Sequence, residues 1–387
     1  MVSSVGIRRR KWNLRVAAVE TTLRCDQACS FCGSRASRNA REELSTEELL
    51  DVFKQVVALG AETIELTGGE TYLRDDWLTL VAGARAVGAE CTLITAGGAI
   101  DDALARRARD AGLSRVGVSL DGPAEIHDSL RGNRGSFDRG RKAMDAFRKA
   151  GIPVGCSTQL NAKNWRELPR LADVLLGECL YAWQIQLMIP MGRASEAKSL
   201  WLQPFDMLEL IPLVASVIER CASAGLRVNS ACNLGYFGPH EQTLRKFTSN
   251  LTHTRGCAAG VVMISIDSAG NIAGCSALDA SQSCGGNVRS HSIRERWETA
   301  PELRIGFARS PAWGYCATCY YASVCRGGCS ATSIAMTGRQ GNNPYCHHRA
   351  LELASRGLRE RLVPLDFVSV GRRGYGRFRV DVEPIAG

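Results

Sequence analysis

The stretch VAAVETTLRCDQACSFC, residues 16–32, decides how the rest of this chain is interpreted. A short apolar run, typical of a buried strand, is followed at once by three cysteines, Cys25, Cys29 and Cys32. Three thiolates on one loop suit three irons of a cubane cluster and leave the fourth iron without a protein ligand. An open iron binds a small molecule, so the stretch predicts redox chemistry on a bound ligand rather than a purely structural cluster.

Apolar runs continue to alternate with amphipathic stretches as far as about Leu226. This alternation predicts a parallel sheet, and six such units, rather than eight, predict an α/β fold with a partial (β/α)6 TIM-like barrel. Ser45 and Glu48 match a capping box at one helix start. The predicted strands are Val16–Thr21, Thr63–Leu66, Cys91–Ile94, Arg115–Ser119, Val154–Gln159 and Trp183–Met188, and the predicted helices are Ser45–Leu59, Asp76–Val87, Asp101–Ala111, Ser136–Ala150, Asn164–Leu176 and Pro204–Ala224.

Polar and glycine-rich groups follow these strands at one predicted rim. The cysteine loop follows the first strand and Gly68-Gly69-Glu70 the second, while Ser119 with Asp121 ends the fourth and Gln159 with Asn161 the fifth. In barrel folds the chemistry lies at the C-terminal ends of the strands. The sequence therefore predicts one site built from all four groups.

The cysteine triad and Gly68-Gly69-Glu70, each after its strand, resemble the radical S-adenosylmethionine (SAM) enzymes over residues 16–226. Zinc is the alternative ligand for the triad alone. The resemblance implies a radical-SAM [4Fe-4S] cluster held by Cys25, Cys29 and Cys32, with SAM chelated by the open iron. Reduction of that cluster would cleave SAM to a 5′-deoxyadenosyl radical, which removes a hydrogen atom from a substrate.

The resemblance also implies roles for the residues that would bind SAM. Phe31 would meet the adenine through its backbone, and Gly68-Gly69-Glu70 would hold the methionine ammonium. Ser119 matches the position that contacts the ribose. Arg131 would either meet the SAM carboxylate or form a surface ion pair. No residue is assigned as a catalytic acid or base.

A second group of cysteines has the spacing Cys257-x12-Gly270-x4-Cys275, followed by five more cysteines. The group resembles the seven-cysteine SPASM domain, which implies two auxiliary iron–sulfur clusters of the four-iron type. A zinc ribbon is the alternative, although seven thiolates exceed one zinc site. By the family pattern Cys257, Cys275 and Cys329 would hold the nearer auxiliary cluster, and Cys316, Cys319, Cys325 and Cys346 the outer one.

The nearer cluster lacks an obvious fourth cysteine. Either one iron stays open for substrate, or Cys284 or a non-cysteine group completes the cluster. The scattered cysteines are expected to pack in the interior. Cys284 is the exception, because it lies between members of the second group. The scattered cysteines are Cys91, Cys156, Cys179, Cys221, Cys232 and Cys284.

The implied substrate is a ribosomally made precursor peptide, modified by a crosslink, a thioether or a similar change. An aminosugar or amino acid is the small-molecule alternative, and sulfatase maturation ranks lower because Ser276 stands where those enzymes have a catalytic Asp. With 24 residues before Cys25, a separate leader-recognition protein is a possible partner. An electron donor of the flavodoxin or ferredoxin type is also expected.

The charge and the apolar pattern of the chain argue against a nucleic-acid-binding protein and against a membrane protein. The net charge of +9 is spread along the chain without a nucleic-acid-binding motif, and the most apolar stretch, Met207 to Leu226, is interrupted by charges. We therefore expect a cytoplasmic protein without nucleic-acid or membrane partners. The expected division is 1–15 as an N-terminal segment, 16–226 as the radical SAM barrel, 227–256 as a linker, 257–346 as the SPASM domain and 347–387 as a tail.

Overall fold

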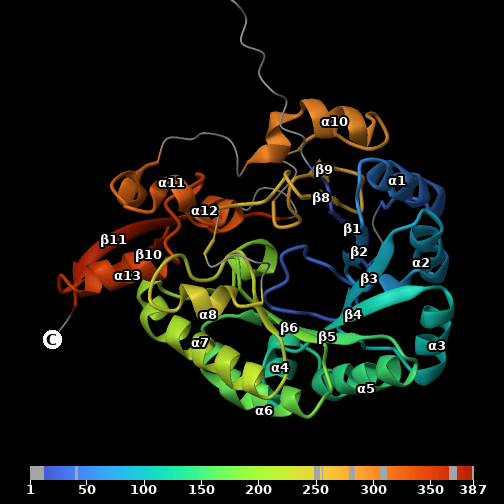
Figure 1. The fold of residues 1–387 in the computed structure, drawn as a ribbon, viewed down its shortest axis with the longest axis horizontal. Helices are drawn as coiled ribbons and strands as arrows, with labels where there is room; N and C mark the ends of the chain where they lie inside the picture. Colours follow the sequence, from blue (N-terminus) through green and yellow to red (C-terminus); the bar gives the residue numbers. More distant parts are fainter. Residues whose placement is uncertain are drawn as a thin grey trace, which may run out of the picture.

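A curved, mainly parallel sheet organises the chain, with helices along its outer face (Figure 1). The structure is a computed structural model that describes residues 13–39, 42–247, 253–254, 256–278, 284–305, 312–365 and 373–385. Within these residues nine strands join in the order β7-β6-β5-β4-β3-β2-β1-β8-β9. They are β1 (Val16–Thr22), β2 (Thr63–Gly68), β3 (Glu90–Thr95), β4 (Leu113–Ser119), β5 (Val154–Leu160), β6 (Ala182–Leu187), β7 (Val228–Ser230), β8 (Met263–Ile266) and β9 (Ile272–Ala273).

The helices of the first part of the chain cover the convex face of this sheet (Figure 1). The capping box is confirmed, because the Ser45 hydroxyl accepts a hydrogen bond from the Glu48 backbone and the Glu48 carboxylate accepts one from the Ser45 backbone. These helices are α1 (Thr46–Ala58), α2 (Trp77–Ala86), α3 (Asp102–Asp110), α4 (Ala124–Arg131), α5 (Ser136–Lys149), α6 (Leu168–Leu176), α7 (Met207–Ser223) and α8 (Glu241–Arg245).

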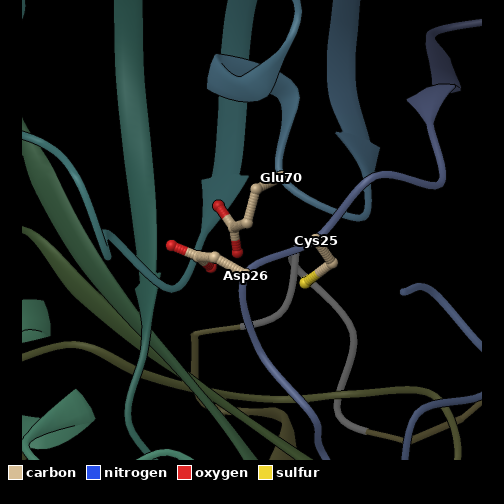
Figure 2. Close-up of side chains that lie close together, drawn as sticks. All are labelled: Cys25, Asp26 and Glu70. Carbon is tan, nitrogen blue, oxygen red and sulfur yellow. The ribbon is translucent and has the colours of Figure 1, made fainter. Parts of the chain in front are cut away.

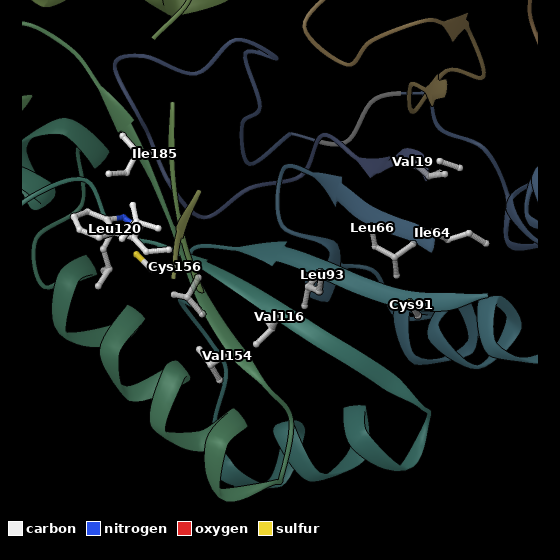
Figure 3. Packing of buried hydrophobic residues seen from close by; sticks show 14 of the residues in the cluster. Val19, Ile64, Leu66, Cys91, Leu93, Val116, Leu120, Val154, Cys156 and Ile185 are labelled. Atoms are coloured by element: carbon white, nitrogen blue, oxygen red, sulfur yellow. The ribbon is translucent and has the colours of Figure 1, made fainter. Parts of the chain in front are cut away.

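The hydrophobic core lies between the sheet and these helices. Alternate strand residues such as Val19, Leu66, Leu93 and Val116 are completely buried there, and Figure 3 shows them along successive strands. Their neighbours in sequence point to the concave side, where the strand ends meet the loops. The core thus fixes the strands from one side and leaves the other side for the site.

The six predicted strands and the α/β barrel class are confirmed, with ends that differ by one or two residues. Helix α4 was not predicted, and it is only eight residues long. The stretch Lys198–Ser223 is long and apolar enough to cross a membrane by length and composition, but half of it is buried inside the fold, as is usual for a core helix.

The cysteine-rich part of the chain lies at the top of Figure 1, where residues Ile293–Thr299 pack against α1. It reaches the sheet through β8, which pairs in parallel with β1 from Val16 opposite Met263 to Val19 opposite Ile266. The last residues form two antiparallel strands that pair with each other, and Phe378 packs edge-on against Trp201. The remaining elements are α10 (Ile293–Thr299), α11 (Ala322–Cys325), α12 (Ser330–Thr337), α13 (His347–Ala354), β10 (Leu358–Pro364) and β11 (Phe378–Pro384).

Candidate active site

The loop that carries the first three cysteines lies at the C-terminal end of β1, as predicted. Cys25 and Cys29 are buried and Cys32 is half-buried. Backbone hydrogen bonds tie this cluster loop to the end of α4, since the Ala28 and Ser30 amides donate to the carbonyls of Arg131 and Leu130 at 3.0 Å each. The unpredicted helix α4 therefore fixes the position of the cysteines.

A second clamp comes from the turn after β6. The Arg193 guanidinium donates to the carbonyl of Cys29 at 2.6 Å and to that of Ala36 at 2.9 Å, and the Arg193 amide donates to the carbonyl of Cys32 at 2.9 Å. Gly192 lies in the left-handed region, and a Cβ atom there would come within 2.3 Å of the Gly33 carbonyl. The cluster loop is thus held from two sides before any metal binds.

The three thiols form a donor set that fits an iron–sulfur cluster. Burial raises the pKa of Cys29 to about 11, although the guanidinium of Arg131 opposes this. Burial also raises the pKa of Cys25 well above its usual range. In the metal-free chain these groups are neutral thiols, so metal binding has to release protons.

The loop Gly68-Gly69-Glu70 packs directly on the cluster loop. A Cβ at Gly68, whose φ is +139°, would lie 2.3 Å from the Thr22 carbonyl oxygen, and one at Gly69 would lie 2.1 Å from that of Arg24. Any side chain would force the two loops apart. The structure therefore requires these glycines for the contact between the loops, a reason that differs from the predicted approach to a ligand.

Glu70 and Asp26 bring two carboxylates together beside Cys25 (Figure 2). One oxygen from each carboxylate and the Cys25 sulfur lie within 4.8 Å of one another. Glu70 is held by the Thr95 hydroxyl and by the Ala96 amide at 2.8 Å. Burial, with the Asp26 charge adding to it, raises the pKa of Glu70 to about 7. Two adjacent acids in a buried place favour a cation between or beside them.

Arg131 is buried rather than at the surface, so the alternative of a surface ion pair is wrong. Its Nη2 and Nε atoms donate to one oxygen of Asp121 at 2.6 and 2.9 Å. Its Nη1 atom faces the Cys29 sulfur at 3.8 Å, and its guanidinium lies over the Phe31 ring at 5.3 Å. A fixed positive charge thus lies beside the cysteine triad.

A cavity of about 320 Å³ opens beside the cluster loop. Phe31, Cys32 and Gly68 form one wall, and Gln159 with Gln186 contributes to another. The side-chain oxygen of Gln159 is buried without a hydrogen-bond partner, which fits a bound ligand that offers a donor. Ser119 ends β4 half-buried beside Ser157 and is not among the residues that line the cavity.

One wall of the cavity contains an ion pair that the sequence did not indicate. Glu20, on β1, accepts a hydrogen bond from Arg373 at 2.8 Å, and both side chains are buried. Glu20 also accepts from Ser34 of the cluster loop at 2.9 Å, and Arg373 donates to the carbonyl of Ser276 at 2.6 Å. The C-terminal residues thus reach back to the first strand and close one side of the cavity.

The seven cysteines of the second group fall into two places. The four assigned to the outer cluster line one small apolar cavity together with Tyr315 and Tyr321. In the other set, the charges of Cys257 and Cys329 are among the causes that raise the pKa of Cys275, so these three lie close together. Cys284 contacts its own turn at Gly286. The expected burial is wrong for Cys179 and Cys232, which are exposed.

Comparison with known proteins agrees with this geometry. The sequence model of the radical SAM superfamily matches residues 19–175. The AdoMet-dependent heme synthase of Methanosarcina barkeri is 28% identical over 346 residues, which is 87% of this chain and 97% of that protein. The mycofactocin maturase MftC of Mycobacterium tuberculosis is 28% identical over 333 residues, which is 84% of this chain and 81% of that protein.

Solved structures share the fold. SuiB of Streptococcus suis bound to the precursor peptide SuiA superposes with a TM-score of 0.67 at 17% identity, over 86% of this chain and 74% of that one. Native anSMEcpe with bound AdoMet gives a TM-score of 0.68 at 17% identity, over 87% and 94% of the two chains. The chain thus contains a radical SAM domain over residues 19–175, with the cysteine triad at the end of β1, and its relatives include the maturase MftC.

Proposed function

We propose that this radical SAM enzyme cleaves SAM reductively and uses the 5′-deoxyadenosyl radical to abstract hydrogen from a peptide side chain or backbone. The product is a post-translational modification of a ribosomally made peptide, such as a crosslink or a thioether. One observation carries the proposal. The cavity beside the cluster loop is lined mainly by uncharged amide, hydroxyl and apolar groups, which match the amides of a peptide.

The chain would bind its cofactors with the residues already described. Cys25, Cys29 and Cys32 would hold a [4Fe-4S] cluster, which when bound and reduced supplies the electron that cleaves SAM. Glu70, supported by Asp26, would bind the methionine ammonium.

Arg131 would counter the negative charge of the SAM carboxylate beside Cys29. The backbone at Phe31 would meet the adenine. Ser119 stays the predicted ribose contact, and Gln159, whose oxygen lacks a partner, is an additional candidate for a SAM hydroxyl or amino group.

A tetrapyrrole substrate is the second candidate, because heme synthases stand among the curated relatives. Haem-type tetrapyrroles carry several carboxylate arms, and a buried carboxylate needs a cation or several donors. Among the described residues that line the cavity, Arg373 is the one basic side chain, and it is paired with Glu20. This charge balance favours a peptide over a polycarboxylate.

The remaining expectations join the proposal. The seven cysteines of the second group would hold two auxiliary iron–sulfur clusters of the four-iron type. A flavodoxin- or ferredoxin-type donor would supply electrons, and a separate protein would present the peptide leader. The reaction would take place in the cytoplasm, where thiols stay reduced for metal binding.

The test is anaerobic turnover of the protein reconstituted with iron and sulfide. The protein receives dithionite, SAM and either the short peptide encoded beside its gene or iron-coproporphyrin III. Chromatography measures 5′-deoxyadenosine, and mass spectrometry measures each candidate substrate. We expect deoxyadenosine in both reactions and a mass change in the peptide only.

Two other results would change the conclusion. A loss of carbon dioxide from the porphyrin, with the peptide unchanged, would move the assignment to the tetrapyrrole class. Absence of deoxyadenosine from protein that has its full iron content would overturn the radical reaction itself. The Cys29→Ala variant serves as the blank for both.

A further inference from the structure

We propose that Cys232 is the fourth ligand of the nearer auxiliary cluster, which then has no iron open to substrate. The inference rests on the proposed function, because it presumes that Cys257, Cys275 and Cys329 hold a cluster. It replaces the predicted alternatives of an open iron and of Cys284. Its basis is the place that the fold gives to Cys232.

The backbone of Cys232 is held close to that of Cys329 through one phenol oxygen. The Tyr236 hydroxyl donates to the Cys232 carbonyl at 2.8 Å and accepts from the Cys329 amide at 2.9 Å. The Tyr236 side chain is itself buried. Two cysteines that are 97 positions apart in the sequence therefore meet at the hydroxyl of one ring.

The sulfur atoms also meet. The neighbouring Cys329 sulfur is the first cause that raises the pKa of the Cys232 thiol, and the charges of Cys257 and Cys275 add to it, so these four sulfurs lie near one another. The three predicted ligands and Cys232 therefore lie around the proposed site of the nearer auxiliary cluster. Cys232 is not part of the hydrophobic core.

Hydrogen bonds hold the residues on both sides of Cys232 to the sixth strand of the barrel. The Ala231 amide donates to the Ile185 carbonyl at 2.8 Å, which continues the pairing of β7 with β6. The Asn233 side chain exchanges two hydrogen bonds with the backbone of Leu187, at 2.8 and 3.1 Å. Cys232 thus projects from the end of a barrel strand, and the barrel itself would supply a ligand to the auxiliary cluster.

The turn that follows has an unusual backbone. Residues 235–238 all have positive φ, including the non-glycine residues Tyr236 at 72° and Phe237 at 52°. Such a run is costly for residues with a side chain. Here it places the Tyr236 ring against Gly328, where a Cβ would lie 2.7 Å from the ring. The strained turn and the glycine together bring Cys232 and Cys329 to the same oxygen.

Cys284, the predicted alternative, is placed differently. Its sulfur accepts from the Gly286 amide at 3.4 Å and donates to the Gly286 carbonyl at 3.2 Å. These contacts lie within its own turn. Cys329, Cys257 and Cys275 all act on the pKa of the Cys232 thiol, which places Cys232 beside these three cysteines.

The number of cysteine ligands on the nearer cluster decides whether the substrate can bind to its iron. Asn233, directly after Cys232, and Ser276, directly after Cys275, both line the cavity. A cluster between these cysteines would therefore stand next to the substrate. With four cysteine ligands it has no coordination position for the substrate, so the peptide has to be positioned by the cavity walls.

The test uses the full chain with the first cluster removed by Cys25→Ala, Cys29→Ala and Cys32→Ala, which we call the auxiliary-only protein. After anaerobic reconstitution we expect about eight irons per chain. Mild oxidation should leave its clusters silent in electron paramagnetic resonance, because each iron has a cysteine ligand. Adding Cys232→Ala should release one iron and produce a three-iron signal of about one spin per chain.

The matched control adds Cys284→Ala to the auxiliary-only protein and should remain silent. If Cys232→Ala fails to fold, Cys232→Ser replaces it, because serine keeps the volume of the side chain. The serine variant should give the same three-iron signal or a shifted spectrum. A three-iron signal in the auxiliary-only protein itself, or one that follows from Cys284→Ala, would overturn the proposal.

Failure of the proposed function gives a different result. If the unmodified protein makes no 5′-deoxyadenosine, the radical reaction is wrong, whatever the spectra of the auxiliary-only protein show. If the auxiliary-only protein takes up only about four irons, it holds one cluster, and both the nearer cluster and its proposed ligand Cys232 would be wrong.

Discussion

The two groups of cysteines are held by different means. The cluster loop lies above the barrel core and is fixed by backbone hydrogen bonds from α4 and from the turn after β6. Cys316, in contrast, lies in a single turn, Gly314–Ala317, that has no buried residue. The first site is preformed by the fold, whereas in the second group Cys325 and Cys329 are buried and the turn that carries Cys316 is not. We infer that metal completes the structure in the second region and only the chemistry in the first.

Cys29→Ala should have the largest effect on activity and a small effect on the fold. The triad would lose one of its three iron ligands, so deoxyadenosine formation should fall to background. The barrel should keep its thermal unfolding midpoint within a few degrees, as should the exposed control Cys179→Ala, which should also keep full activity. Loss of the folded barrel in Cys29→Ala would contradict the distinction between the two regions.

Cys319→Ala should act in the opposite way. SAM cleavage should remain in part, while modified product falls strongly, because the first site does not depend on this cysteine. Hydrogen exchange should lose protection around residues 314–346 and keep it in β1 to β6. Normal product formation by this variant would mean that the outer cluster is only structural.

Glu70→Gln should weaken SAM binding without changing the fold of the barrel or of the cysteine-rich region. Loss of a charged hydrogen bond costs about 1.5–3 kcal/mol, which corresponds to about a tenfold to a hundredfold weaker affinity. Equilibrium dialysis of SAM against the reconstituted protein measures it. An unchanged affinity would show that Glu70 does not hold the ammonium.

The same residue predicts a pH dependence. The pKa of Glu70 is raised from 4.5 to about 7, mainly by burial, so the SAM-free protein takes up a proton there. Its contribution to stability therefore decreases as pH rises from about 4.5 to about 7. SAM affinity should change in the other direction and increase over about pH 6 to 8, since only the carboxylate attracts the ammonium. Glu70→Gln should flatten this profile.

The smallest effect concerns how the tail is attached to the barrel. The Trp201 and Phe378 rings meet edge to face with centroids 4.7 Å apart. A double-mutant cycle with Trp201→Leu and Phe378→Leu should give a coupling of about 1 kcal/mol in the free energy of unfolding. Zero coupling would mean that the tail is held by its backbone contacts alone.

The sequence was most informative where the signal is local. The apolar runs predicted β1 to β6, Ser45 and Glu48 predicted the start of α1, and the spacing of Cys25, Cys29 and Cys32 predicted the site. These features depend on neighbours in the sequence, so a single chain reveals them.

Pairings between distant residues could not be predicted. Glu20 and Arg373 are 353 positions apart, and neither forms part of a motif. Arg131 has a partner ten residues away, but its burial depends on how α4 packs against the cluster loop. Cys232 had no spacing that linked it to the second cysteine group. Only the folded chain brings these groups together, because tertiary packing decides which side chains meet.

The pairing of β8 with β1 has a consequence for anyone who divides this chain. Without β8, the first strand would be an exposed edge with unpaired backbone groups, and such an edge recruits other chains. Its residues Val16 and Val19 would lose their partners Met263 and Ile266. A protein truncated after residue 226 should therefore aggregate, because the cysteine-rich region covers this edge of the barrel sheet.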